Sequence, residues 1–210
     1  MKDAAYQPVV KGNASAANLE GFAYVAINAV SQAAISFTGQ NLGANKPERV
    51  KRVMGCCYAI SAVLAVAITG LFLLFNKPLL ALYGVHAAGD ELARAAYAAA
   101  MTRMTWVLGP YALITTLEIG SGILRGMGKS LTSTVICLLW ACVLRIVWIM
   151  TVFRYFVEHG KEDLLGSIYS SYPISWVLAG VTQFIVAVVI LRRLLRAKRE
   201  QEAVKLEPDC

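Results

Sequence analysis

Long apolar stretches with few charged residues limit most strongly what this chain can fold into. A helix that spans a bilayer needs about 20 mostly apolar residues, and the sequence contains five stretches of that length. We place them at about residues 21–45, 53–76, 102–124, 130–153 and 168–191. No alternating pattern of the kind that builds a membrane barrel appears. The sequence therefore predicts an all-α integral membrane protein with about five transmembrane helices.

The composition agrees with a membrane protein and excludes other classes. Of the 210 residues, 58% are hydrophobic and only 16% are charged, whereas soluble domains have about 25% charged residues. Disordered chains are excluded because they are poor in apolar residues. The net charge of +7 does not indicate a nucleic-acid partner, because the basic residues lie between and after the apolar stretches. Five cysteines without a CxxC pair and two isolated histidines predict neither a disulfide framework nor a metal site.

The distribution of basic residues predicts the orientation in the membrane. Most lysines and arginines lie in the segments after the first, third and fifth stretches. Because basic segments stay in the cytoplasm, residues 196–210 are expected to form a charged cytoplasmic tail, which we expect to be frayed. Residues 1–20 are then an extracytoplasmic stub. They contain no apolar export signal, so we expect a missing preceding helix and a truncated N-terminal side.

The segment before the third span carries signals of its own. Gly89-Asp90-Glu91 predicts a helix start with Asp90 as the N-cap. The alanine-rich run over 92–101 is expected to continue into the span, which Gly109-Pro110 would bend.

Three motifs together resemble a known family. Gly39-Gln40-Asn41-Leu42-Gly43-Ala44 ends the first span, Leu124-Arg125-Gly126-Met127-Gly128-Lys129-Ser130 follows the third, and Ser171-Tyr172-Pro173-Ile174-Ser175-Trp176 opens the fifth. In their helical context they resemble the C-terminal half of the multidrug and toxic compound extrusion (MATE) family, over about residues 14–195.

The resemblance implies a fold and a function. Members have twelve helices in two six-helix lobes, so this chain would supply helices eight to twelve, which is most of one lobe. It implies a secondary antiporter that exports organic cations or drugs across the cytoplasmic membrane in exchange for H+ or Na+. The partners would be membrane lipids, a small organic cation and the missing N-terminal lobe. No cofactor is expected beyond the coupling ion.

Glu118 is the strongest candidate for a functional residue. A carboxylate inside a span is costly unless it is paired, hydrated or neutralised. Such a group can take up a proton on one side and release it on the other, or bind an organic cation. The alternative is a protonated glutamic acid that only hydrogen-bonds a neighbouring helix. The resemblance favours function, because family members often carry an acidic residue at this place in helix ten.

Arg145 is the second charge within a span. It must find a carboxylate, backbone carbonyls or water, because arginine stays charged. One interpretation is an ion pair with Glu118. The other is a structural link near the membrane boundary, with the side chain extended towards the headgroups.

The first span has a polar face that lines either a cavity or a helix–helix contact. Its members lie three or four residues apart and are Tyr24, Asn28, Ser31, Gln32 and Ser36. We take the first four, with Glu118, as the candidate cation- and substrate-binding residues. Five aromatic residues have two interpretations. They stack on a flat cationic drug, or they pack in the core and anchor the helices at the membrane interface. They are Tyr111, Trp140, Trp148, Tyr172 and Trp176.

Functions other than an antiporter are also compatible with parts of the sequence. The sequence contains no GxSxG, HExxH or P-loop motif, so an enzyme is not expected. The alternatives are a non-transporting fragment or packing module that needs a partner lobe, and a flippase for a lipid-linked substrate.

Overall fold

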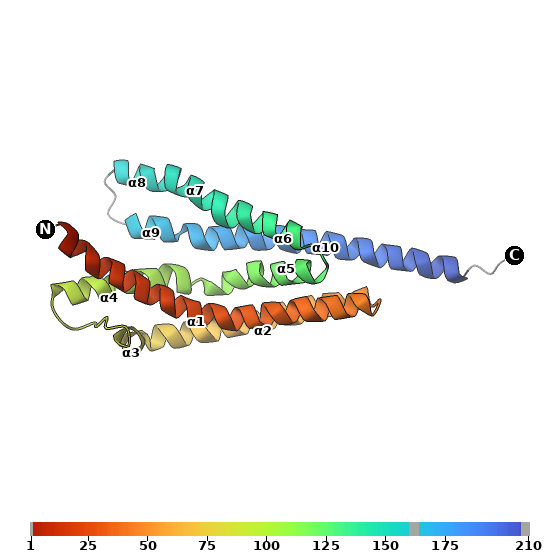
Figure 1. The fold of residues 1–210 in the computed structure, drawn as a ribbon, viewed down its shortest axis with the longest axis horizontal. Coiled ribbons are helices and arrows are strands. Elements are labelled where there is room, and N and C mark those ends of the chain that lie inside the picture. The colour runs from red at the N-terminus through yellow and green to blue at the C-terminus, as the bar shows by residue number, and fades with distance from the viewer. Residues whose placement is uncertain (1, 160–163, 207–210) are drawn as a thin grey trace.

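The computed structural model describes residues 2–159 and 164–206 of the chain, with side chains described for residues 7–159 and 166–203. Every regular element in the described part is helical. The helices lie roughly side by side in an elongated bundle, from which the last helix projects (Figure 1). The prediction of an all-α fold is confirmed.

The first helix, α1, is longer than the predicted span. It runs from Lys2 to Gly43 without a break at residue 20, so the expected boundary between a stub and a first span has no counterpart in the backbone. The added length is packed: Ala16 and Leu19 are buried in the main core, and the backbone at Gly12 lies against Ala96. Burial of these small and apolar side chains extends the helix.

The second and third spans follow in order. A 3-10 turn, Pro47–Arg49, leads into α2 (Val50–Leu74), and the short α3 (Asn76–Ala81) follows. Asp90 caps α4 (Glu91–Arg103), since its Oδ1 accepts a hydrogen bond of 2.9 Å from the Ala93 amide. This confirms the predicted helix start.

The predicted bend at Gly109-Pro110 is also present. A π-helical turn (η2, Met104–Leu108) precedes these residues, a 3-10 turn (η3, Tyr111–Leu113) follows them, and α5 (Ile114–Gly126) completes the span. Proline lacks the amide hydrogen that a continuous helix needs, so the helix is interrupted there.

The remaining segments form a helical hairpin. The first arm comprises α6 (Ser130–Cys137), η4 (Leu138–Val143), α7 (Leu144–Trp148), η5 (Ile149–Phe153) and α8 (Arg154–Glu158). The second comprises α9 (Leu164–Tyr169) and α10 (Ser171–Leu206).

The charged tail is not frayed where the structure describes it. Helix α10 continues through it to Leu206, and residues 207–210 lie outside the described residues. Glu, Lys, Gln and Ala form helices readily. Lys198 also pairs with Glu202 one turn further on at 3.7 Å and with Glu48 across the bundle at 3.2 Å, which holds the start of the tail in place.

Four stretches among the described residues are long and apolar enough to span a membrane. They are Pro47–Leu74, Glu91–Gly126, Ser130–Glu158 and Gly166–Ala203. Helix α1 is not among them, because its polar face lowers its hydropathy. Its span over residues 21–45 stays a prediction.

The helix α5 occupies the centre, in contact with α1, α2, α6 and α10. Two of its glycines allow α1 to approach closely. A Cβ atom at Gly122 would lie 2.8 Å from the Ser31 carbonyl oxygen, and one at Gly126 would lie 2.7 Å from that of Ile35. Neither distance is tolerable, so the absence of side chains at these two positions sets the distance between α1 and α5.

We expect Gly126→Ala to destabilise the protein by about 1–3 kcal/mol, because the methyl group overpacks the contact with Ile35 and Thr38. Gly55→Ala in α2 is the matched control. Nothing lies within 4 Å of its Cβ position, and alanine favours a helix by up to about 1 kcal/mol. Thermal unfolding of the detergent-solubilised chain measures both. Equal effects of the two variants would contradict the packing described.

Candidate functional site

Glu118 on α5 points to the polar face of α1. The hydroxyl of Tyr24 donates a hydrogen bond to Glu118 Oε1 at 3.4 Å, and Asn28 Nδ2 donates to the Tyr24 hydroxyl at 3.3 Å. One turn further along, Ser31 Oγ donates to the backbone carbonyl of Glu118 at 2.9 Å. The structure therefore brings four of the five candidate binding residues together.

The fifth candidate, Gln32, lies elsewhere. Its side chain is exposed and takes part in none of the hydrogen bonds recorded for the described residues. It follows Ser31 directly, so its side chain is rotated by about 100° around the helix from that of Ser31. A spacing of four residues from Asn28 put it on the predicted face, but the contact with α5 falls on the other edge of that face.

Of the two interpretations of Arg145, the structure does not support the ion pair with Glu118. Arg145 Nη2 instead donates to Ser175 Oγ at 3.1 Å, and the guanidinium lies 4.0 Å from the centre of the Tyr172 ring. Both partners are on α10, which packs directly against α7, whereas Glu118 faces α1. The Nε of Arg145 is buried without a hydrogen-bond partner among the described residues.

A cavity of about 300 Å³ lies between α1 and the α7–α10 hairpin. Its polar and aromatic lining comprises Glu20, Tyr24, Tyr111, Arg145, Tyr172 and Trp176. The rings of Tyr111 and Trp176 meet edge to face with centres 5.8 Å apart. Since Tyr24 both lines the cavity and bonds Glu118, this hydroxyl joins the cavity to the carboxylate.

Three of the five aromatic residues singled out in the sequence line this cavity, and the other two bind neighbouring segments. Trp140 Nε1 donates to Thr182 Oγ1 at 3.1 Å, and Trp148 Nε1 donates to the Ser167 carbonyl at 2.8 Å. Packing is therefore the role that the structure supports for Trp140 and Trp148.

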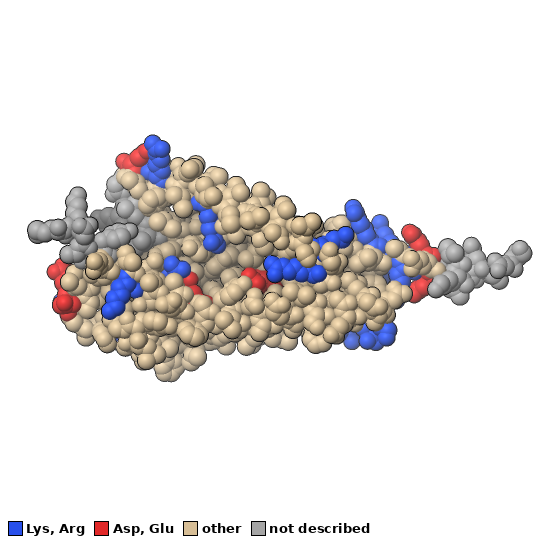
Figure 2. Space-filling model, viewed as in Figure 1, with Lys and Arg blue, Asp and Glu red and all other residues tan. Residues whose placement is uncertain are grey.

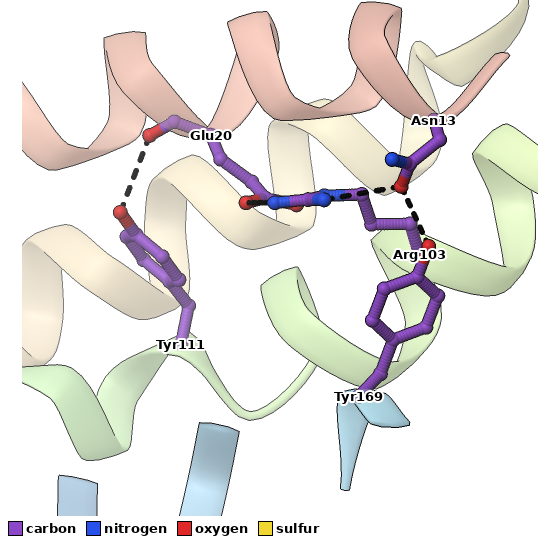
Figure 3. A network of polar contacts seen from close by, with 5 residues as sticks. All are labelled: Asn13, Glu20, Arg103, Tyr111 and Tyr169. Carbon is purple, nitrogen blue, oxygen red and sulfur yellow. Dashed lines mark hydrogen bonds and ion pairs between the residues drawn. The ribbon is translucent and has the colours of Figure 1, made fainter. Parts of the chain in front are cut away.

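A second polar cluster, which the sequence reasoning missed, joins α1 to α4 and α9 (Figure 3). Arg103 Nε and Nη2 lie 2.6 Å and 2.8 Å from the two carboxylate oxygens of Glu20. Arg103 Nη1 and the Tyr169 hydroxyl both donate to Asn13 Oδ1, at 3.0 Å and 2.6 Å, while the Tyr111 hydroxyl donates to the Glu20 carbonyl at 3.2 Å.

Both charged side chains of this cluster are only 13% exposed. The sequence analysis singled out neither Glu20, the last residue before the first predicted span, nor Arg103, at the start of the third. The available signal was that each is a single charge at the edge of an apolar stretch. Sequence alone did not indicate that the two edges meet.

Comparison with known proteins settles the family. The family model MatE matches residues 9–151. The chain belongs to the MatE family. This confirms the resemblance carried by the three sequence motifs. No curated protein gives a significant match.

Solved transporters share the fold of this MatE chain. A MATE protein in complex with MaL6 superposes with a TM-score of 0.74 at 17% identity, covering 89% of this chain and 40% of the other. A MATE multidrug-resistance transporter of the MOP superfamily matches in its outward-facing form (TM-score 0.73, 16% identity, 89% and 39% covered). An inward-facing form matches with a TM-score of 0.71 at 15% identity (86% and 39% covered).

These matches establish a multi-pass membrane protein with a MATE-like fold. The chain spans about two fifths of the length of the transporters that it matches. The matched proteins are transporters rather than enzymes, which agrees with the expectation from the sequence.

We expect Arg103→Leu to destabilise the chain by about 3–5 kcal/mol, because it leaves the Glu20 carboxylate buried without its partner. Replacing both residues by leucine should recover much of that loss. Arg154→Leu is the matched control, since Arg154 is 76% exposed in its pair with Glu158 and such pairs contribute less than about 1 kcal/mol. Denaturant unfolding measures all three, and a small effect of Arg103→Leu would show that the cluster is hydrated rather than buried.

Proposed function

We propose that this MatE chain forms most of one six-helix lobe of a two-lobed, cation-coupled antiporter that exports organic cations or drugs. The observation that carries the proposal is the carboxylate of Glu118, which accepts a hydrogen bond from Tyr24, a residue that also lines an aromatic cavity. Asn28 donates in turn to the Tyr24 hydroxyl. The family and the multidrug-resistance transporters among the matched structures support it.

The chemistry of Glu118 suits exchange. Among the described residues it has a neutral hydrogen-bond donor, Tyr24, and no salt bridge. An ionised carboxylate in such a place is stabilised by whichever cation reaches it. A coupling ion and an organic cation that compete for one carboxylate cannot both be bound. Uptake of one therefore releases the other, which is the requirement for antiport.

The aromatic cavity next to Glu118 supplies a surface for a flat organic cation. Tyr111 and Trp176 line this cavity with their rings, and a cation over such a ring gains about 0.5–2 kcal/mol. One face of the Tyr172 ring is already covered by Arg145. Arg145 lines the same cavity and would repel a cation close to it. The cation is therefore expected on the α1 side, near Glu118 and Tyr24.

Alternating access would follow from movement of whole lobes. The chain matches the inward-facing and outward-facing transporters about equally well, with TM-scores of 0.71 and 0.73. This similarity supports a lobe that moves as a rigid body while its partner lobe completes the cavity. Transport by this chain is therefore expected to require a second lobe.

The protein is proposed to lie in the inner (cytoplasmic) membrane, with its C-terminal end in the cytoplasm. The loop before α2, the turn after α5 and the projecting end of α10 all lie at one end of the bundle (Figure 1). Basic side chains gather at that end, on the right of the view (Figure 2). Basic segments remain on the cytoplasmic side.

We expect Glu118→Gln, made in a complete two-lobed transporter that contains this chain, to abolish export that depends on the proton or sodium gradient. Glutamine keeps the shape but carries no negative charge to attract a cation and cannot take up or release a proton. Everted vesicles that take up a fluorescent organic cation from the medium, energised by an outward gradient of H+ or Na+ in separate arms, provide the measurement. Glu158→Gln, the same chemical change at an exposed site, should leave export intact.

The hydroxyl of Tyr24 provides a finer test. Tyr24→Phe keeps the ring that lines the cavity but removes the donor to Glu118, so we expect the pH dependence of export to change more than the substrate affinity does.

Unchanged export and ion dependence in Glu118→Gln would refute the proposed function.

A further inference from the structure

An apolar groove between α1 and α2 ends at two arginines. Its volume is about 790 Å³. The walls are formed by small and aliphatic side chains with one aromatic ring, among them Ala29, Ala33 and Phe37 of α1 and Cys56, Ile60 and Leu64 of α2. Arg49 and Arg52 lie at the end next to the loop that joins the two helices.

This groove is separate from the cavity near Glu118. Ala26 lines the groove and Asn28 belongs to the Glu118 cluster. These residues are two positions apart in one helix, so their side chains point about 200° apart around its axis. The groove is therefore on the opposite side of α1, and the proposed transport mechanism does not use it.

The guanidinium groups of the two arginines have no fixed partner among the described residues. Within residues 7–159 and 166–203, neither guanidinium makes a recorded salt bridge or side-chain hydrogen bond, and both are exposed. They are three residues apart, so they lie on one face and repel each other. The adjacent carboxylate of Glu48 interacts electrostatically with Arg49, but its salt bridge is with Lys198 at 3.2 Å, so it fixes neither guanidinium.

The groove and the arginines together fit one kind of molecule. Guanidinium groups bind phosphate through paired hydrogen bonds, and an apolar groove within a span accommodates a hydrocarbon chain. We propose that the groove binds an anionic phospholipid, with its phosphate at Arg49 and Arg52 and an acyl chain along α1 and α2. The proposal rests on the orientation given above, in which this end meets the anionic cytoplasmic leaflet.

Lipid titration of the purified full chain, followed by native mass spectrometry, tests the proposal. Phosphatidylglycerol and phosphatidylcholine with identical acyl chains are the two probes, and we expect a preference for phosphatidylglycerol. Each basic residue contributes about 1 kcal/mol to anionic-lipid binding. Arg49→Gln with Arg52→Gln should therefore weaken phosphatidylglycerol binding about thirtyfold and remove the preference.

The matched control is Arg192→Gln with Arg193→Gln. These two exposed arginines of α10 give the same change in net charge away from the groove, and phosphatidylglycerol affinity should be unchanged. Equal losses in the two double variants would overturn the proposal, because they would show attraction to general positive charge. Equal affinity for the two lipids in the unaltered chain would overturn it as well.

A second pair of variants tests the groove itself. Ala33→Phe fills it and leaves both arginines in place, so lipid binding should fall. Val66→Phe, at a 63% exposed position of α2 outside the groove lining, should have no effect. Glycerol phosphate at the same concentration should not compete. If it displaces the lipid, or if Ala33→Phe binds lipid normally, the groove is not the binding site.

The outcome is separable from that of the transport proposal. Glu118 belongs to α5 and contacts the side of α1 opposite the groove. The variant Glu118→Gln should therefore leave lipid binding unchanged. Unchanged export in Glu118→Gln refutes the proposed function and leaves the lipid proposal standing. Unchanged phosphatidylglycerol binding in the Arg49→Gln, Arg52→Gln double variant overturns the lipid proposal and leaves the transport proposal standing.

Discussion

The close approach of α1 to α5 is the contact on which the rest of the structure depends. It is set by Gly122 and Gly126, where a single methyl group would collide with the backbone of α1. At this separation Ser31 reaches the backbone carbonyl of Glu118, and Tyr24 reaches its carboxylate. A wider spacing between α1 and α5 would break both hydrogen bonds. The polar site therefore depends on the absence of side chains at the two glycines.

The charges within the bundle are stabilised in different ways, and this difference distinguishes Glu118. Glu20 is bound by two nitrogen atoms of Arg103. Arg145 lies over the ring of Tyr172 and donates to Ser175. Within the described residues the Glu118 carboxylate accepts a hydrogen bond from the uncharged Tyr24 hydroxyl and makes no salt bridge, although the exposed Arg125 acts on it electrostatically from a distance. A carboxylate with a fixed basic partner is already neutralised, whereas one without such a partner retains affinity for a mobile cation.

The sequence predicted those features that depend on local chemistry. Spans follow from apolar length, the start of α4 from Asp90, and the bend from Gly109-Pro110. It also grouped Glu118 with the polar face of the first span as binding candidates, and the structure places Tyr24 and Ser31 of that face against Glu118. Their role in binding stays a prediction. Helix α1 was less well predicted: its residues before 21 form no apolar stretch, and only burial against α4 shows that they continue the helix.

Long-range pairing was the part that sequence could not supply. Glu20 and Arg103 are 83 positions apart, and no local rule places one beside the other. Arg145 had two interpretations in the sequence analysis, an ion pair with Glu118 or a link near the membrane boundary. Its partners, Ser175 and Tyr172, follow from the packing of α10 beside α7. The exclusion of Gln32 from the site is of the same kind, since a rotation by one residue around α1 decides which side chains face α5.

The central claim is that Glu118 is an accessible, cation-binding carboxylate rather than a sealed packing contact. Carbodiimide labelling tests it most directly: a hydrophobic carbodiimide reacts with carboxyl groups that it can reach, and peptide mass spectrometry locates the adduct. The account predicts an adduct at Glu118 that forms more slowly in the presence of Na+, raised pH or the organic cation tetraphenylphosphonium. No adduct at Glu118, or an adduct whose rate none of these changes, would contradict it.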